Sequence, residues 1–398
     1  MRPGGSVAAS LVSSDAGLRS ALDGARGSGR LALDTEFLRE RTYRSRLCLV
    51  QIATPESLSL IDPLAKVDLA PLAELVAEPS VEVVVHAGRQ DFELFYERFG
   101  ALPVNVFDVQ IAAGFVGHGA SLPYARVVEI VLGRKLIKGE SYSDWCRRPL
   151  TESQLRYAAD DVAWLLEVAD RLKRELLERE RLEWAREEMK GLEDKGTYEV
   201  DPGESWRRVG GRGSLSSNKL AVLREVARWR EETAMRRDLP RGWVMKDPTL
   251  IEIARRGPRD LAGLRVIRGL NAGEAGRSGT ELLAAVAKGA GSRPPEEPRS
   301  LPRWAQVRAR TLSGLADAIV RARSEGAQIA TELVATRGEL ESLLADVVTG
   351  SLNEDGSKHR LLQGWRRELA GGAVLNLARG RIAVRASERP PYIEEVPL

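Results

Sequence analysis

The 398-residue chain lacks any apolar run of the length a membrane helix needs, and it contains only two cysteines. A membrane span takes roughly 18 or more consecutive apolar residues, so we expect none here. The first residues, MRPGGSVAASLVSSDAGLRSAL, are too weakly apolar for a signal peptide and reach Asp15 early. These absences favour a cytoplasmic protein without a membrane partner.

The scarcity of cysteine is typical of a reducing compartment and gives no disulfide framework. Cys48 lies in the apolar run RLCLVQIA, and the other cysteine is Cys146. We therefore expect Cys48 to be a small hydrophobic residue of the core.

Charge is distributed unevenly along an otherwise ordinary composition, with 43% hydrophobic and 29% charged residues. Residues 1–200 carry 26 Lys and Arg against 32 Asp and Glu, whereas residues 201–398 carry 34 against 25. An excess of positive charge in the C-terminal half favours a polyanionic partner.

The pattern of apolar residues predicts a mixed α/β region followed by helical regions. Expected strands cover residues 31–37, 46–54, 57–62 and 81–87, and expected helices cover 71–78, 91–100, 105–117, 123–133 and a long stretch at 151–192. Linkers are expected near 190–213 and 290–303, with helical segments after each. Trp-Arg pairs at Trp229 and Trp365 suggest a faint internal duplication.

The strand LALDTEF contains two carboxylates where a buried strand should be apolar. Side chains alternate along a strand, so Asp34 and Glu36 share one face. Two unpaired like charges are costly to bury side by side, which suggests that a positive group lies between them.

Further carboxylates lie in apolar surroundings. Asp91 follows a buried strand, and Asp108 opens a helix where capping would explain it. In LRYAADDVAWLL, helical periodicity assigns Asp160 to the solvent stripe and Asp161 to the core face, in line with Tyr157.

Asp34, Glu36, Asp91 and Asp161 together make a donor set suited to two divalent cations, Mg²⁺ or Mn²⁺. Two such ions can hold the attacking and leaving oxygens of a phosphoryl displacement. The alternative, which the spacing leaves open, is that these acids accept bonds from backbone amides or cap helices.

Three motifs, DTEF at 34–37, HAGRQD at 86–91 and YAADD at 157–161, resemble those of the DEDD exonuclease superfamily. The third motif has a tyrosine, Tyr157, four residues before Asp161, and in this it resembles the tyrosine subclass of that superfamily. Within it, the stretches LDTEFLRERTY, LCLVQIA, FDVQIAAGFVG and LIKGESYSDWCRRPLTESQLRYAADDV resemble the bacterial ribonuclease D family. The resemblance is strong over residues 30–180, continues over 215–285 as an HRDC domain, and fades over 305–385.

That resemblance implies a ribonuclease H-like α/β exonuclease domain with a five-stranded mixed sheet, followed by two all-α HRDC-like domains. The implied boundaries are 1–205, 206–290 and 291–398. Asp34, Glu36 and Asp161 would bind a first metal, and Asp34 with Asp91 a second. Tyr157 would orient and help deprotonate the attacking water.

The implied reaction is metal-dependent hydrolysis at the 3′ end of RNA, releasing 5′-mononucleotides stepwise. The implied substrates are tRNA precursors or other structured RNA 3′ ends, and we expect a monomer. One alternative is an exonuclease acting mainly on DNA or short oligonucleotides. Another is a catalytically inactive nucleic-acid-binding scaffold, which the intact carboxylates and tyrosine disfavour.

Other residues have weaker assignments. Phe37 could pack against the terminal base, Arg41 and Tyr43 could contact the substrate backbone, and His86 could support the site, although a structural histidine is the simpler interpretation. Among the aromatic residues of the basic half, Trp229 and Trp243 are expected in the core.

Overall fold

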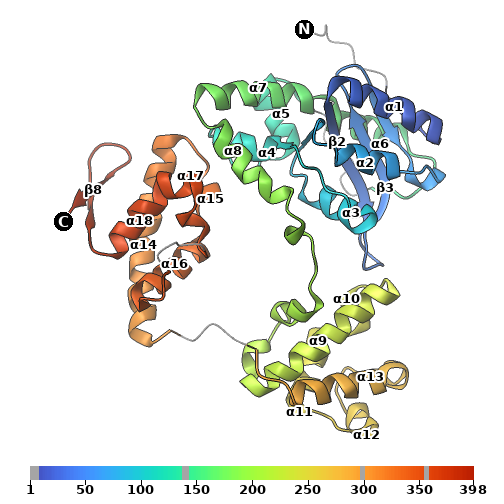
Figure 1. Ribbon diagram of the computed structural model, residues 1–398, viewed down its shortest axis with the longest axis vertical. Coiled ribbons are helices and arrows are strands. Elements are labelled where there is room, and N and C mark those ends of the chain that lie inside the picture. Colours follow the sequence, from blue (N-terminus) through green and yellow to red (C-terminus); the bar gives the residue numbers. More distant parts are fainter. Residues whose placement is uncertain (1–8, 137–142, 296–300, 354–357) are drawn as a thin grey trace. The chain divides into compact units, whose positions relative to one another are not determined.

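A computed structural model describes residues 9–136, 143–295, 301–353 and 358–398 (Figure 1). Contacts divide the chain into two compact units. The first unit contains the chain up to Glu36, Cys48–Thr197 and the part from Ser300 onward, and the second contains Phe37–Leu47 and Tyr198–Arg299.

The first unit is built around a mixed sheet, which has six strands among the described residues, in the order β1-β4-β3-β2-β5-β6. The strands are β1 Ser10–Val12, β2 Arg30–Leu38, β3 Arg46–Ala53, β4 Leu58–Ile61, β5 Glu82–Val85 and β6 Val106–Asp108. Neighbours β3 and β4 are antiparallel, whereas β2 with β5, β5 with β6 and β1 with β4 are parallel.

The expectation of five strands is therefore wrong by one strand. The added strand β1 spans three residues and pairs with β4 in the register Ser10↔Ser59 to Val12↔Ile61. A three-residue strand has almost no periodicity, and its partner lies far away in the sequence, so no local pattern marks it.

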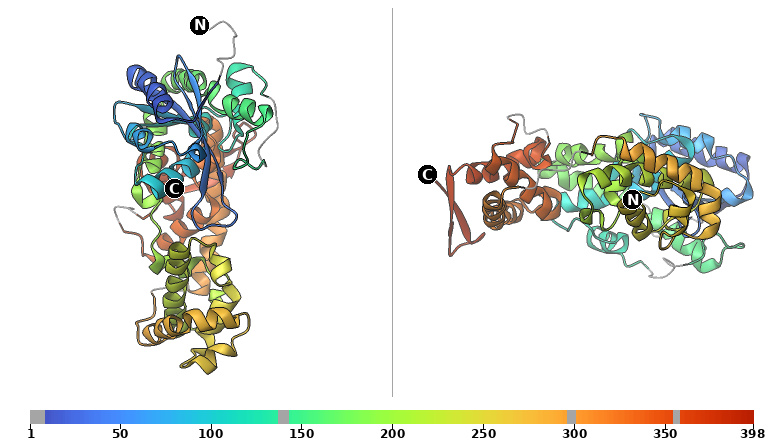
Figure 2. Two further views of the ribbon diagram at one scale, coloured as in Figure 1. Left: turned by 90° about the vertical axis from the view of Figure 1, so that its right-hand side faces the viewer. Right: turned by 90° about the horizontal axis from the view of Figure 1, so that it is seen from below.

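Helices cover the sheet and bury its central strands. Every residue of β3 after Arg46 is buried, which requires cover on both faces. The helices of this domain are α1 Asp15–Ser28, α2 Ala70–Val76, α3 Arg89–Phe99, α4 Val109–Phe115, α5 Tyr124–Leu132, α6 Glu152–Ala163, α7 Leu165–Glu178 and α8 Leu182–Met189. Helix α6 packs against β4, α7 against β5 and α8 against β6. Figures 1 and 2 show helices of this part of the chain around the sheet.

The long helix expected over 151–192 is divided into α6, α7 and α8, so this expectation is wrong in its continuity. Thr151 caps α6 through a capping box with Gln154, as its sequence position suggested. The first break falls at Trp164, and the second falls at Glu180, which has a positive φ of 57°. Neither residue is a glycine or proline, so the usual markers of a break are missing.

The C-terminal helices pack on the α/β domain within the same unit. They are α14 Arg303–Ala327, α15 Thr331–Val334, α16 Arg337–Thr349, α17 Gly364–Arg366 and α18 Gly372–Ala378. The Ala330 amide donates to the Gly114 carbonyl at 2.9 Å. The Trp365 ring lies 4.8 Å from that of Phe115 and 5.8 Å from that of Trp184. An unanticipated antiparallel hairpin follows, with β7 Ile382–Ala386 and β8 Ile393–Pro397.

The second unit is a helical domain with its own core. Its helices are α9 Ser217–Arg237, α10 Arg241–Val244, α11 Asp247–Arg256, α12 Leu261–Arg265 and α13 Ala272–Ala290. Trp206, Trp229 and, from the β2–β3 connection, Tyr43 are part of this core. Trp229 is buried as expected, but Trp243 is 62% exposed, so its expected place in the core is wrong.

A structural repeat relates α9–α10–α11 to α14–α15–α16 with a constant offset of ninety residues. Asp238 and Gln328 both adopt the left-handed conformation after the long helix. Met245 and Ala335 both end the short helix in extended conformation. Trp229 and Trp365, which suggested a duplication, lie in α9 and α17 and are not equivalent in this repeat.

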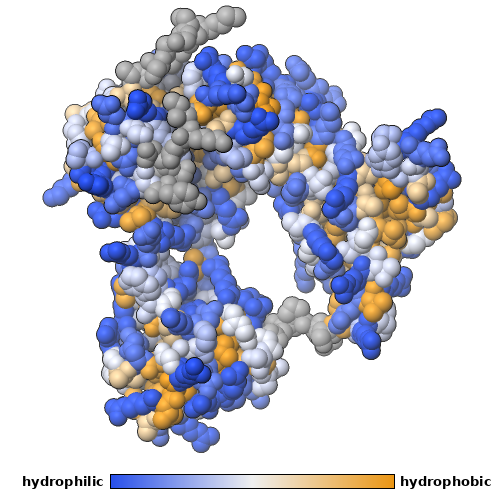
Figure 3. All heavy atoms as spheres, turned by 180° about the vertical axis from the view of Figure 1, so that it is seen from behind, coloured by the Kyte–Doolittle hydropathy of each residue, from blue (hydrophilic) through white to orange (hydrophobic). Residues whose placement is uncertain are grey.

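The surface is mostly hydrophilic on the face drawn in Figure 3, with small apolar patches on each part. In the part of the chain that the structure describes, no helix is both long and apolar enough to cross a membrane.

Replacing Trp365 with alanine should weaken the packing of the C-terminal helices on the α/β domain. The side chain is 1% exposed, and removing a buried tryptophan costs about 3–5 kcal/mol of unfolding free energy. Urea unfolding of the full chain measures the change. Trp304→Ala is the matched control, because Trp304 is 58% exposed and should change stability by no more than about 0.5 kcal/mol. Equal losses in both variants would contradict the packing described above.

Candidate active site

Strand β2 and helix α6 bring three carboxylates together. Asp34 and Glu36 lie on one face of β2, between the neighbouring strands β3 and β5. Each offers a carboxylate oxygen, as does Asp161, and these three oxygens lie within 4.8 Å of one another. Asp160 is not part of this group, in agreement with the helical periodicity.

Asp91 lies close to this group from helix α3. It occupies the first turn of that helix and is 7% exposed. The Thr35 hydroxyl, from the residue between Asp34 and Glu36, donates a hydrogen bond to Asp91 Oδ1. The charge of Asp91 contributes to the raised pKa values of both Asp34 and Glu36.

The four carboxyl groups share a strongly acidic, desolvated environment. Desolvation first, and the charges of Asp161 and Asp91 second, raise the pKa of Glu36 to about 8. Desolvation also raises the pKa values of Asp91 and Asp161 to about 7, and the pKa of Asp34 well above its usual range. Such crowding disfavours four negative charges unless a cation balances them.

The donor set fits hard divalent cations. All three oxygens of the Asp34, Glu36 and Asp161 group come from carboxylates, which Mg²⁺ and Mn²⁺ prefer to nitrogen or sulfur. The three side chains are partly buried rather than enclosed, so substrate oxygens could complete a coordination shell.

Tyr157 lies on α6 one turn before Asp161, with its ring against Trp145. The two ring centroids are 5.9 Å apart and the planes are inclined by 40°. Trp145 is 3% exposed, so it forms a buried wall beside the tyrosine.

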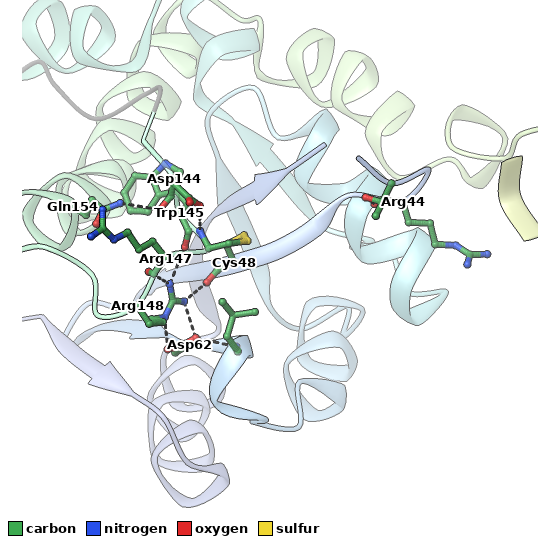
Figure 4. The surroundings of a disulfide bond; sticks show 11 residues. Arg44, Cys48, Asp62, Asp144, Trp145, Arg147, Arg148 and Gln154 are labelled. Carbon is green, nitrogen blue, oxygen red and sulfur yellow. Dashed lines mark hydrogen bonds and ion pairs between the residues drawn. A yellow bond between two sulfur atoms is a disulfide. The ribbon is translucent and has the colours of Figure 1, made fainter. Parts of the chain in front are cut away.

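Arg148 fixes the segment that carries Trp145 (Figure 4). Its guanidinium donates to both carboxylate oxygens of Asp62 at 2.7 Å and to the Cys48 carbonyl at 2.6 Å. It also donates to the Trp145 carbonyl at 2.8 Å. This network holds the segment before α6 against strands β3 and β4.

A disulfide between Cys48 and Cys146 adds a covalent link at the same place (Figure 4). The expectation of no disulfide is therefore wrong, although Cys48 is buried in the core as expected. The two cysteines are 98 residues apart, and such spacing carries no signal of pairing.

Asp108 organises the turn that leads into α3. Its buried carboxylate accepts hydrogen bonds from the amides of Gln110 and Ile111, which is the capping expected from sequence. It also accepts from the amides of Ala87 and Gly88, both at 3.1 Å. Ala87 has a positive φ of 55°, so the carboxylate stabilises a strained turn two residues before Asp91's helix begins.

The weaker sequence candidates occupy different environments. His86 is bound by its Nε2 to the Leu122 carbonyl at 2.9 Å. Phe37 is half-buried at the end of β2, and Arg41 is exposed. The Tyr43 side chain is buried. Its hydroxyl is hydrogen-bonded to Glu231 and Arg241 of the same chain.

One further tyrosine lies near the carboxylates without a sequence signal. Burial raises the pKa of Tyr124 well above its usual range, and the charges of Asp161 and Asp34 raise it further. Its ring lies 5.5 Å from that of His86. A tyrosine at the start of helix α5 is unremarkable in sequence, so only the fold brings it to the site.

Family models match both parts of the chain. A 3′–5′ exonuclease model matches residues 10–177, and an HRDC domain model matches residues 219–286. The chain is 38% identical to ribonuclease D of Acidiphilium cryptum over 92% of each chain. It is 39% identical to ribonuclease D of Granulibacter bethesdensis over 89% of this chain and 88% of that protein.

Solved structures agree with these relatives. The structure of Escherichia coli RNase D, described as an exoribonuclease involved in structured RNA processing, superimposes with a TM-score of 0.81. It is 33% identical and covers 94% of this chain and 99% of that one. The catalytic core of RRP6 from Trypanosoma brucei has a TM-score of 0.54 at 26% identity, over 72% of this chain and 80% of that one.

The raised pKa values predict how pH and metal affect stability. The folded, metal-free protein binds more protons at Glu36, Asp91 and Asp161 than the unfolded chain, so its stability should fall as pH rises from about 4 to about 8. A cation competes with those protons, so Mg²⁺ or Mn²⁺ should raise Tm more at the upper end of this window than at the lower end.

Thermal unfolding in EDTA and in each metal, across this pH range, measures both effects. Asp161→Asn should reduce the metal-induced rise in Tm, whereas Asp160→Asn should preserve it. A rise in Tm that is the same at every pH would count against metal binding by these carboxylates.

The disulfide predicts the thiol content of the purified protein. Thiol titration of the denatured, unreduced chain should find no free cysteine, and both cysteines should react after reduction. Reduction or Cys146→Ser should lower the unfolding free energy by about 2–4 kcal/mol, because the closed loop is long. Reductant should then have no further effect on the Cys146→Ser variant. Two free thiols in the untreated protein would show that the bond is absent in solution.

Proposed function

The chain belongs to the ribonuclease D family, and from this premise we propose how its acidic centre carries out its reaction. The protein is a metal-dependent 3′–5′ exoribonuclease. The observation that carries the proposal is the convergence of Asp34, Glu36 and Asp161 within 4.8 Å, with Asp91 beside them.

The four carboxylates would divide the binding of two divalent cations. Asp34, Glu36 and Asp161 would hold one, and Asp34 together with Asp91 would hold the other, Asp91 acting through bound water. Bound cations of this kind activate water and stabilise the leaving oxygen of a phosphodiester. The raised pKa values support cation binding by this group as a whole, because bound cations would balance its crowded negative charge.

Tyr157 would orient the attacking water and help to remove its proton. Its place on α6, one turn before Asp161, supports this role, because residues four apart share one face of a helix. The ring of Trp145 packs beside the tyrosine ring. The product would be a 5′-mononucleotide, released one at a time from the 3′ end.

The physiological substrate would be an RNA whose 3′ end adjoins a folded body, such as a tRNA precursor. The E. coli relative is described as acting in structured RNA processing, and this chain carries a basic domain beyond the exonuclease domain. We further propose that residues 291–398 form a second, divergent HRDC-like domain, which the ninety-residue repeat supports. A cytoplasmic monomer is the simplest state for this enzyme.

Substitutions at the carboxylates should show which acidic residues the reaction requires. Asp34→Asn and Asp161→Asn should abolish release of mononucleotides from 3′-labelled RNA, because each removes a metal ligand. Tyr157→Phe should lower kcat by about 10²-fold, the lower end of the range for loss of a general acid or base. Asp160→Asn is the matched control on the same helix and should retain activity.

The assay compares 3′-labelled and 5′-labelled RNA and matched DNA in Mg²⁺, Mn²⁺ and EDTA. Metal-dependent loss of the 3′ label as mononucleotides is the expected result. Faster degradation of DNA than of RNA would favour the DNA alternative. Binding of RNA without cleavage in any metal would favour the inactive scaffold, and cleavage in EDTA would contradict the metal mechanism.

A further inference from the structure

The connection between β2 and β3 belongs to the helical unit rather than to the sheet. Residues Phe37–Leu47 form one compact unit with Tyr198–Arg299. The preceding residues of the same strand carry Asp34 and Glu36 and belong to the other unit. A single strand therefore connects the catalytic carboxylates to a segment that is part of the HRDC unit.

Tyr43 is the residue that joins this segment to the helices. It is 7% exposed and belongs to the core of the helical unit. Its hydroxyl donates a hydrogen bond to Glu231 Oε1 and accepts one from Arg241 Nη2 at 3.1 Å. The Arg241 guanidinium also lies over the tyrosine ring, 4.8 Å from its centroid.

The partners of Tyr43 form an ion pair between a buried glutamate and a partly exposed arginine. Arg241 binds both oxygens of Glu231 at 2.6 Å, and Glu231 is 1% exposed. Burial alone would raise the pKa of Glu231, but the hydrogen bonds of Arg241 and Tyr43 hold that pKa below its ordinary value. Loss of the Tyr43 hydroxyl would leave a buried carboxylate with one donor fewer, which is costly. A second bond, from the Arg44 amide to Asp238 at 3.0 Å, holds the segment at the end of α9.

The joined segment is strongly basic. Its four arginines, Arg39, Arg41, Arg44 and Arg46, are exposed, and its single acid is Glu40. Residues 198–299 add 20 Lys and Arg against 14 Asp and Glu. RNA is attracted by such a concentration of positive charge, because binding releases its condensed counterions.

We propose that the β2–β3 connection and the HRDC unit act as one RNA-binding surface, and that Tyr43 is the positioning residue that holds the two parts together. Tyr43 does not touch RNA in this proposal. It fixes Arg41 and Arg44 relative to the helical unit, so that both parts bind the body of one RNA whose 3′ end is being cut. The proposal rests on the proposed function, because it concerns how the same enzyme holds its substrate.

The test is the preference of the full-length enzyme for a long substrate over a short one. A stem-loop RNA with a single-stranded 3′ extension offers a folded body for this surface to bind, whereas a short oligonucleotide offers none. Tyr43→Phe should raise KM for the stem-loop RNA and lower the ratio of kcat/KM between the two substrates by about tenfold, equivalent to 1.4 kcal/mol. The kcat on the stem-loop RNA should stay within a factor of about two.

A second variant tests whether Tyr43 acts through the arginines. Arg41→Ala should lower the affinity for the stem-loop RNA and reduce the slope of log affinity against log salt by about 0.7 per lost phosphate contact. In the Tyr43→Phe background, the same substitution should have a much smaller effect, because the arginine is no longer held in place. Fluorescence anisotropy in EDTA measures both, since cutting requires metal.

Tyr392→Phe and Arg26→Ala are the matched controls, and both should leave the substrate ratio and the salt slope unchanged. Tyr392 is 62% exposed, and Arg26 lies in helix α1. Independent effects of Arg41→Ala and Tyr43→Phe would overturn the proposal, as would an equal loss on long and short substrates. If the wild-type enzyme cut neither substrate, the proposed function would fail instead, and the binding measurement would still decide whether Tyr43 positions the arginines.

Discussion

Repulsion among carboxylates is the constraint on which the exonuclease unit depends. Asp34, Glu36 and Asp161 place their oxygens within 4.8 Å, and Asp91 is close enough to raise the pKa values of two of them. A fold can hold such a group only if the surrounding backbone resists its separation. The central strand β2, the Thr35 bond to Asp91 and the capped helix α6 supply this resistance. In the proposed mechanism, bound cations would balance this charge.

Local periodicity was enough to predict the carboxylates but not the contacts that support them. Alternation along a strand paired Asp34 with Glu36, and helical spacing separated Asp161 from Asp160. The link between Cys48 and Cys146 joins residues 98 apart, and a pattern of a few residues cannot reveal it. The same reason explains why β1, whose partner strand lies elsewhere in the chain, was missed. Roles of the site residues in catalysis stay predictions until the variants are measured.

Strand β2 gives the two units a shared element. Its first residues pair with β5 in the sheet, and the connection that follows is fixed to the helical unit by Tyr43. From sequence, Tyr43 is a candidate for contact with the substrate backbone, together with Arg41. Its hydroxyl is bonded to Glu231 and Arg241, nearly two hundred residues later, so only the folded chain shows that the side chain is buried.

The structural repeat of α9–α10–α11 and α14–α15–α16 shows that one backbone pattern can occur in two different environments. In the second copy, Leu333 packs on the exonuclease domain so closely that a Cβ added to Gly114 would lie 2.6 Å from its Cδ1. The equivalent position in the first copy is Trp243, which is 62% exposed. Trp243 is a large aromatic residue of a type often found in a core, so its type alone does not show that it is exposed. The two copies therefore share a fold, although Leu333 packs against Gly114 and the equivalent Trp243 is exposed. The sequence alone could not show which of these two side chains is the exposed one.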